Sequence, residues 1–330
     1  MEVSRRDFLK IVLATALGDS ILLGYTGSAD GQQNAQRRHP NKTDVRNAPS
    51  PLAIEKGLEG LIKDKIGKEV AAGNISPQDD ISILIYDVNN DAELVRINAS
   101  AQIDAASTSK ALGAMVYFDQ TSPQMCTHNP SEIKRDLELS LQTIGRDWQE
   151  SIRAANRVTK RIGGPSAVNR VLHEKYGHIF RSTSIVDYIP ENGSAYSDKI
   201  SAEDYARFWL ALWKNEFPCS GELKRLLKWR KPDEYHKKPL RIIESDSELP
   251  KYVRVVYNKT GTTERVKIDG GVAVFHINGQ EQVYIIIGAA QGNADVKVLQ
   301  GKNVPQSLRN IFKVVPEYIE ATTRLVQHHN

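Results

Sequence analysis

The chain has 330 residues, of which 40% are hydrophobic and 25% are charged, and its formal net charge is +4. This is the composition of a globular protein, with enough apolar residues for one large domain or two small ones. The small excess of positive charge is scattered along the chain, so it does not predict nucleic-acid binding. No apolar run in the body of the chain is long enough to span a bilayer.

The N-terminal segment differs from the rest of the chain. The pair Arg5-Arg6 is followed by Phe8-Leu9-Lys10, by a mildly apolar stretch over 11–25 and by small residues over 27–29. This order resembles a twin-arginine export signal with a cleavage site before Asp30. A short amphipathic helix is the alternative.

We therefore expect residues 1–29 to be a signal peptide that the twin-arginine translocase recognises. Residues 30–50 are rich in Gln, Asn, Arg and Pro, which predicts a disordered spacer. The domain that follows, residues 51–330, is then expected in the periplasm, in the cell envelope or outside the cell.

The mature chain begins with a predicted helix and a predicted hairpin. Apolar residues recur at helical spacing over 51–72, and this helix is expected to end near Gly73. The β-rich run 81–88 and the segment 92–97 predict two strands joined by a turn at 89–91.

Helical patterns dominate from Ser107 to about Phe217. Periodic apolar residues predict helices over 131–141, 148–162 and 166–174. The segment 183–199 has few periodic features, so we expect a long surface loop there. Ser201 is the expected N-cap of a further helix, because an acidic residue follows it at the third position.

The β patterns return after a mixed, basic segment over 218–250, which we expect to be a loop. Strands are predicted over 252–257, 271–277 and 282–289. The periodic stretch 305–327 predicts one closing helix. The order of elements predicts an α+β fold of two lobes, an antiparallel sheet flanked by the N- and C-terminal helices and an all-helical lobe over about 107–217.

Ser107 lies where the chain passes from the predicted sheet to the predicted helices, and Lys110 follows three residues later. On a helix these side chains share a face, so the lysine amine would lie beside the serine hydroxyl and could take its proton. The helix N-terminus would add N–H groups that favour a developing oxyanion. The alternative is a serine N-cap followed by a solvated lysine.

A second motif, Lys259-Thr260-Gly261, follows the strand predicted over 252–257. The lysine supplies a charge, the threonine a hydroxyl and the glycine room for a substrate backbone, which together fit a carboxylate-binding strand edge. Alone, the three residues are explained equally by a turn after a strand. The two motifs together, in this order, are more specific than either.

With both motifs the chain resembles the serine β-lactamase and penicillin-binding protein superfamily, and within it the class A β-lactamases, over about 51–327. Further stretches that resemble class A lie at 83–87, 154–156, 162–165, 201–212 and 269–272. The resemblance implies that Ser107 is an acylated nucleophile and that Lys110 is its base.

The resemblance also assigns the strand motif. It implies that Lys259 and Thr260 hold a substrate carboxylate, with Gly261 allowing a close approach. The backbone N–H groups of Ser107 and Thr262 then form an oxyanion hole.

Two departures from class A concern turnover. With residues 154–156 aligned, the Ser-Asp-Asn motif of the family falls on Glu150-Ser151-Ile152. A slip of one residue lets Ser151 supply the hydroxyl, but Ile152 cannot supply the amide that contacts a substrate side chain.

The second departure lies in the loop predicted over 183–199. With Pro190 aligned, Ile189 occupies the place of the glutamate that activates the deacylating water in class A. The nearby acids Asp187 and Glu191 either substitute as the base or are ordinary solvated loop residues. The resemblance therefore implies acylation followed by slow deacylation.

Three functions follow from this resemblance. The first is a serine hydrolase that acts on a β-lactam or a related amide or ester through an acyl-serine intermediate. The second is an enzyme like the D-Ala-D-Ala carboxypeptidases or penicillin-binding proteins, with a peptidoglycan-related substrate. The third is a non-catalytic relative of the fold. We expect a monomer that binds a small-molecule substrate without a cofactor.

The cysteine and histidine residues do not predict a metal site, because neither type shows a metal-ligand spacing. Cys126 and Cys219 either form a disulfide, which export permits, or remain two free thiols.

Overall fold

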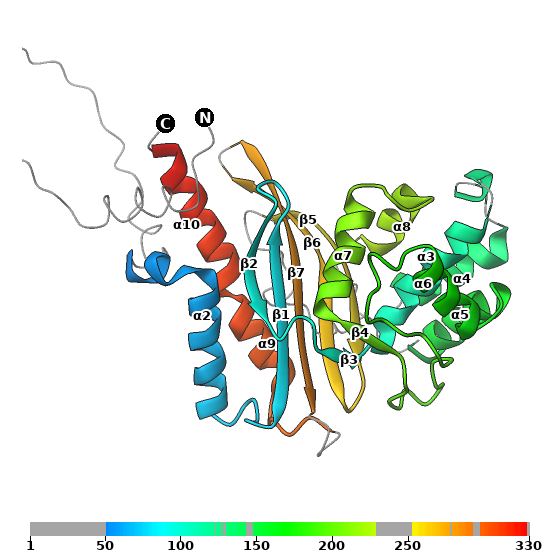
Figure 1. Ribbon diagram of the computed structural model, residues 1–330, viewed down its shortest axis with the longest axis horizontal. Helices are drawn as coiled ribbons and strands as arrows, with labels where there is room; N and C mark the ends of the chain where they lie inside the picture. The colour runs from blue at the N-terminus through cyan, green and yellow to red at the C-terminus, as the bar shows by residue number, and fades with distance from the viewer. Residues whose placement is uncertain are drawn as a thin grey trace, which may run out of the picture.

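The computed structural model places a five-stranded antiparallel sheet between two sets of helices (Figure 1). It describes residues 51–121, 123–126, 128, 130–142, 148–228, 253–277, 279–292 and 298–328. The predicted signal peptide, 1–29, and spacer, 30–50, lie outside the described residues. The predicted α+β class is confirmed.

The sheet has the strand order β2-β1-β7-β6-β5. Its strands are β1 (Asp79–Asp87), β2 (Ala92–Ile97), β5 (Val253–Thr262), β6 (Val266–Ile277) and β7 (Gln280–Gly292). The last strand, β7, pairs with β1, so the N-terminal hairpin and the three C-terminal strands form one sheet. In this order β5 is an edge strand, and at Tyr257 its outer side forms an isolated antiparallel bridge with Lys228.

The central strands are buried along almost their whole length, because helices cover both faces of the sheet. One face packs against α2 (Pro51–Ala71), α9 (Val304–Phe312) and α10 (Val314–His328). The prediction of one closing helix over 305–327 is wrong, since two helices meet at Lys313. Pro316 lies in the first turn of α10, and its missing N–H favours a new helix start there.

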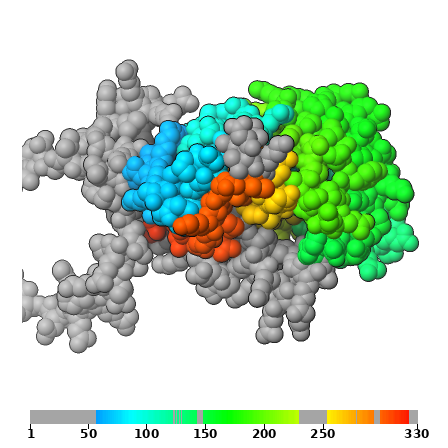
Figure 2. All heavy atoms as spheres, turned by 90° about the horizontal axis from the view of Figure 1, so that it is seen from below, coloured from blue at the N-terminus to red at the C-terminus, as the bar shows by residue number. Residues whose placement is uncertain are grey.

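The helical lobe covers the other face (Figures 1 and 2). Its helices are α3 (Ser109–Gln120), α4 (Ser131–Gln142), α5 (Trp148–Arg161), α6 (Pro165–Glu174), α7 (Ala202–Trp213) and α8 (Ser220–Leu227). The predicted loop over 218–250 is therefore wrong for α8, whose leucines Leu223, Leu226 and Leu227 are buried. Within the described residues, no helix is both long enough and apolar enough to cross a membrane.

Two short strands join the loop after α6 to the segment before Ser107. They are β3 (Gln102–Asp104) and β4 (Lys199–Ser201), which pair with each other and were not predicted. Ser201 is the N-cap of α7, as predicted, since its hydroxyl accepts a hydrogen bond from the Asp204 N–H at 3.0 Å. This pairing brings the end of the loop next to the turn that carries Ser107.

Cys126 and Cys219 form a disulfide, with their Cα atoms 5.1 Å apart. The bond joins the segment after α3 to the start of α8 across a sequence separation of 93 residues. It therefore closes a large loop within the helical lobe.

We expect the double substitution Cys126→Ser with Cys219→Ser to lower the free energy of unfolding by about 2–4 kcal/mol, because the unfolded chain is no longer constrained by this loop. Urea denaturation of the oxidised domain, followed by tryptophan fluorescence, measures the change. Wild-type protein with a reductant should approach the double variant. Equal stability of all three samples would show that the bond does not stabilise the fold.

Candidate active site

Ser107 lies in a 3₁₀ turn, η1 (Ala106–Thr108), that leads directly into α3. The preceding residue, Ala106, has a φ of +45°, in the left-handed region that residues with a Cβ rarely adopt. Two hydroxyl groups hold its carbonyl oxygen. Ser109 Oγ donates to it at 2.9 Å, and the Tyr196 hydroxyl donates to the same oxygen.

Lys110 enters the site from the protein interior, because α3 is buried on all sides and the lysine is only 7% exposed. Its Nζ donates to Ser151 Oγ at 2.9 Å, and Ser151 Oγ donates to the Ser140 carbonyl at 3.2 Å. The structure thus brings together Lys110 and Ser151, which the sequence placed 41 positions apart.

The electrostatic surroundings of Lys110 favour its neutral form. Burial, followed by the positive charge of Lys259, holds the pKa of the Lys110 amine well below its usual range. A neutral amine has a lone pair and can accept a proton from a neighbouring hydroxyl.

Lys259, Thr260 and Gly261 lie inside β5, which continues through Thr262, and not after the strand as predicted. Gly261 is where β5 meets the turn of Ser107. A Cβ at this position would lie 2.9 Å from the Ala106 Cβ and 3.0 Å from the Ala105 carbonyl oxygen. Glycine is therefore required for the close approach of the two motifs.

Lys259 is held at the same edge. The Tyr205 hydroxyl of α7 donates to the Lys259 carbonyl at 2.7 Å, and Lys259 Nζ donates to the Thr260 carbonyl at 3.1 Å. The β5–β6 register places Thr260 opposite Asp269 and Thr262 opposite Lys267. Since side chains alternate along a strand, both threonines lie on the face opposite to Gly261.

The backbone of β5 supplies one candidate oxyanion donor. The Thr263 N–H donates to the Val266 carbonyl at 3.0 Å. Because successive residues of a strand turn their N–H groups to opposite sides, the Thr262 N–H faces outward from the sheet edge. The Ser107 N–H lies at the start of η1, where a helix leaves its first donors unpaired. The two expected donors therefore flank the contact between Gly261 and Ala106.

Asn156 of α5 fixes the loop behind the site. Its Nδ2 donates to the Ile189 carbonyl at 2.8 Å, and its Oδ1 accepts from the Ile189 N–H at 3.0 Å. Ile189 packs with Ile152, Ala155 and Tyr196 in a small buried cluster. Ile152 and Ile189, which the resemblance marks as departures from class A, thus belong to the same apolar cluster.

The loop acids have different surroundings. Glu191 is 63% exposed in its side chain and pairs with Arg153 at 3.7 Å, which removes it from the interior of the site. Asp187 and Asp198 line a small cavity together with Lys110 and Asn156. Burial raises the pKa of the Asp198 carboxyl to about 6, although its Oδ1 accepts the N–H groups of Val186 and Asp187.

Tyr196 and Asp198, which lie beside the candidate site, were not predicted from the sequence. Neither belongs to a motif of fixed spacing, and both lie in the loop that has few periodic features. The one available signal was the length of that loop, which is typical of functional loops. Among the described residues, no cluster of His, Cys, Asp and Glu side chains is arranged to hold a metal ion.

Comparison with family models matches residues 153–302 to a model described as Beta-lactamase2, the β-lactamase enzyme family. The matched segment begins in α5 and includes Lys259-Thr260-Gly261, but it lies after Ser107 and Lys110. A search of curated proteins finds no significant match.

Solved structures share the fold at low sequence identity. A mutant of PBP-A, in an acyl-enzyme complex with penicillin G, has 15% identity and a TM-score of 0.53, and the match covers 78% of this chain and 96% of that one. The β-lactamase from Streptomyces albus G has 16% identity and a TM-score of 0.53, with 77% and 98% covered. A β-lactamase from Xanthomonas campestris pv. campestris has 14% identity and a TM-score of 0.55, with 80% and 99% covered. These likenesses show that the chain has the fold of β-lactamases and penicillin-binding proteins.

The buried Lys110 makes a prediction about stability. Its folded pKa is lower than its unfolded pKa, so the unfolded state binds more protons and stability rises with pH up to the unfolded pKa near 10.5. We expect Lys110→Met to raise the free energy of unfolding at pH 7 by about 0.5–2 kcal/mol. The difference from wild type should shrink as the pH approaches 10.

Chemical denaturation at several pH values measures this difference. Lys68→Met, at an exposed position of α2, is the matched control and should stay within about 0.5 kcal/mol of wild type throughout. A Lys110→Met variant that is less stable than wild type, by the same amount at every pH, would contradict the assignment of a neutral lysine.

Proposed function

We propose that this chain is a serine hydrolase of the β-lactamase and penicillin-binding protein type, acylated on Ser107 and slow to release the acyl group. The observation that carries the proposal is the buried Lys110 amine, which lies one helical turn from Ser107 and hydrogen-bonds Ser151 at 2.9 Å. The fold and the family-model match support this class of enzyme.

In the proposed acylation, Ser107 Oγ bonds to the carbonyl carbon of an amide or ester, and its proton passes to the neutral Lys110 amine. The carbonyl electron pair moves onto the oxygen, which the N–H groups of Ser107 and Thr262 stabilise. The bond from carbon to the leaving group then breaks. The proton returns to the leaving group through the Ser151 hydroxyl, which is hydrogen-bonded to Lys110 in the free protein.

Substrate binding depends on the outer edge of β5. Lys259 supplies a positive charge beside Thr260, which suits a substrate that carries a carboxylate. This chemistry fits a β-lactam or a peptidoglycan-related amide or ester of small size. A mutant of PBP-A, one of the similar structures, was solved as an acyl-enzyme complex with penicillin G.

The surroundings of Ile189 support slow deacylation. Hydrolysis of an acyl-serine requires a base that activates water. In class A the base is a glutamate in the loop, whereas here the aligned position belongs to the apolar cluster of Ile152, Ala155, Ile189 and Tyr196. An apolar side chain can neither hold nor deprotonate a water molecule.

The N-terminal sequence supports export. Arg5-Arg6 and the apolar stretch that follows suit the twin-arginine translocase. The disulfide between Cys126 and Cys219 suits an oxidising compartment such as the periplasm or the cell exterior. We propose that the mature protein acts there as a monomer.

A second candidate function is that of a D-Ala-D-Ala carboxypeptidase or penicillin-binding protein. The same apolar cluster favours it, because such an enzyme does not use the class A loop glutamate, and PBP-A is among the similar structures. Release of D-alanine from a peptide that ends in D-Ala-D-Ala distinguishes it from a β-lactamase. A non-catalytic relative remains the third alternative, and it predicts that Ser107→Ala leaves the biological effect intact.

Intact-protein mass spectrometry tests the proposal. After incubation with penicillin G, we expect a covalent adduct that maps to Ser107 and is absent from Ser107→Ala. Nitrocefin turnover, measured separately, should be slow relative to formation of the adduct. Absence of an adduct with penicillins and with reactive esters at any pH between 5 and 10 would overturn the proposal.

The slow release makes a separate prediction. We expect Ile189→Glu to speed release of the acyl group by at least about 10-fold, since a carboxylate there can activate water. Decay of the adduct, followed by mass spectrometry, gives the rate. Ile189→Gln has the same shape without a base and is the matched control. Equal acceleration by both variants would mean that loosening of the cluster, and not a base, causes the change.

A further inference from the structure

Two consecutive residues of the loop before β4, Ala195 and Tyr196, contact the two segments that carry the candidate oxyanion donors. The Tyr196 hydroxyl donates to the Ala106 carbonyl, and its oxygen lies 3.0 Å from Ser109 Oγ, which donates to the same carbonyl. The Ala195 N–H donates to Glu264 Oε1 at 3.0 Å. Tyr196 therefore ties the loop to the turn of Ser107, while Ala195 ties it to the connection between β5 and β6.

Each contact lies next to one oxyanion donor. Ala106 directly precedes Ser107, and Glu264 follows Thr262 by two residues. The two N–H groups come from segments that are far apart in sequence, so their separation depends on tertiary contacts alone. Gly261 allows the two segments to approach, but a glycine has no side chain with which to hold them at a fixed spacing.

We propose that Ala195-Tyr196 is a positioning strap, which sets the spacing and orientation of the two oxyanion N–H groups. The proposal rests on the acyl-serine function argued above. Tyr196 and Glu264 are positioning residues, since they act on the Ser107 and Thr262 backbone through Ala106 and the strand connection.

The strain at Ala106 explains why a buried donor is needed. Ala106 has a left-handed φ of +45°, which orients the peptide that joins it to Ser107. A residue with a Cβ keeps this strained conformation only where surrounding contacts stabilise it. Tyr196 lies in the buried cluster with Ile152 and Ile189, so its ring cannot easily move away. Burial raises the pKa of its hydroxyl, which keeps the proton available for donation.

The two contacts differ in strength. The Tyr196 bond is buried, whereas the bond of Glu264 to Ala195 is exposed to solvent. Hydrogen bonds that compete with water contribute less, so Tyr196 should carry the larger share of the positioning.

The experiment measures acylation by penicillin G under single-turnover conditions, which separates the dissociation constant of the first complex from the acylation rate constant. Affinity for phenylboronic acid is measured alongside, because its tetrahedral adduct with the serine places an oxygen in the oxyanion hole. The variants are Tyr196→Phe, Glu264→Ala, the two combined, and Glu264→Gln.

We expect Tyr196→Phe to lower the acylation rate constant about 10-fold, a fraction of the 100- to 1,000-fold that follows loss of an oxyanion donor. Glu264→Ala should lower it about 2- to 3-fold, as expected for an exposed contact. In each of these variants the affinity for phenylboronic acid should fall by the same factor as the acylation rate constant. The dissociation constant for penicillin G should stay unchanged. Glu264→Gln, which keeps an acceptor oxygen, should restore the wild-type rate.

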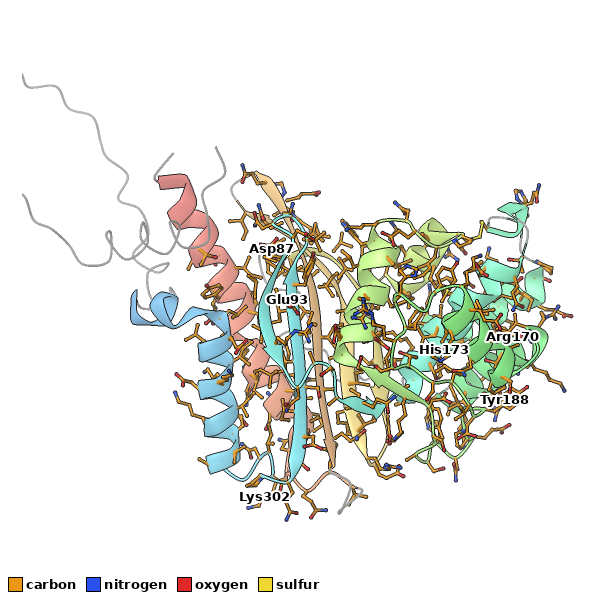
Figure 3. All side chains as sticks on the ribbon, viewed as in Figure 1. Asp87, Glu93, Arg170, His173, Tyr188 and Lys302 are labelled. Carbon is orange, nitrogen blue, oxygen red and sulfur yellow. A yellow bond between two sulfur atoms is a disulfide. The ribbon has the colours of Figure 1, made fainter. Side chains whose placement is uncertain are left out.

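Tyr188→Phe is the matched control in the same loop. Tyr188 is 44% exposed, its hydroxyl lies near Gly164 at the start of α6, and it is found at the outer edge of the helical lobe (Figure 3). This variant should leave all three quantities unchanged.

The outcomes separate the two proposals. If wild-type protein forms neither adduct, the proposed function fails and the strap fails with it. If wild-type protein is acylated and both Tyr196→Phe and Glu264→Ala match its rate, only the strap is overturned. If Tyr196→Phe weakens penicillin binding and thermal stability without a selective loss of boronate affinity, Tyr196 has a general packing role. Glu264→Ala, on the exposed surface, keeps the test available should Tyr196→Phe not fold.

Discussion

The close contact between the edge strand β5 and the turn of Ser107 is the constraint on which the site depends. Only a residue without a Cβ fits at Gly261, because Ala105 and Ala106 occupy the space a side chain would need. A second glycine, Gly270 of β6, lets Tyr205 of α7 lie against the sheet, where a Cβ would be 2.5 Å from its ring. The Tyr205 hydroxyl then reaches the Lys259 carbonyl. Both contacts thus depend on glycines that permit dense packing.

The same packing separates the roles of two lysines. Lys110 lies on a helix that is buried on every side, and desolvation lowers its pKa. Lys259 lies on the partly exposed edge strand β5, and its positive charge lowers the pKa of the Lys110 amine further. In the proposed reaction the first lysine accepts a proton and the second attracts a carboxylate. Their different environments allow identical side chains to serve different purposes, as in other sites with paired titratable groups.

The parts of this structure that follow from local pattern could be predicted from the sequence. They include the hairpin of β1 and β2, the helices α4 to α6 and the N-cap at Ser201. Ser107 and Lys110 could be selected as candidate residues because their spacing is itself local. The pairing of β3 with β4 was not predicted, since each strand has three residues and their partners lie far apart in sequence. The left-handed conformation of Ala106 and its contact with Tyr196 were not predicted for the same reason, because both depend on tertiary contacts.

The apolar cluster of Ile152, Ala155, Ile189 and Tyr196 connects the proposed slow release of the acyl group with the proposed placement of Ser107. By the resemblance to class A, Ile152 and Ile189 occupy positions that carry polar groups in that class, and the two side chains pack against Tyr196. That ring carries the hydroxyl that holds the strained Ala106 carbonyl. A polar group introduced at Ile189 would therefore act on both steps, supplying a base for water and hydrating the surroundings of the tyrosine. In the proposed reaction, retention of the acyl group and orientation of Ser107 would depend on the same packed side chains, so the two properties would be physically coupled.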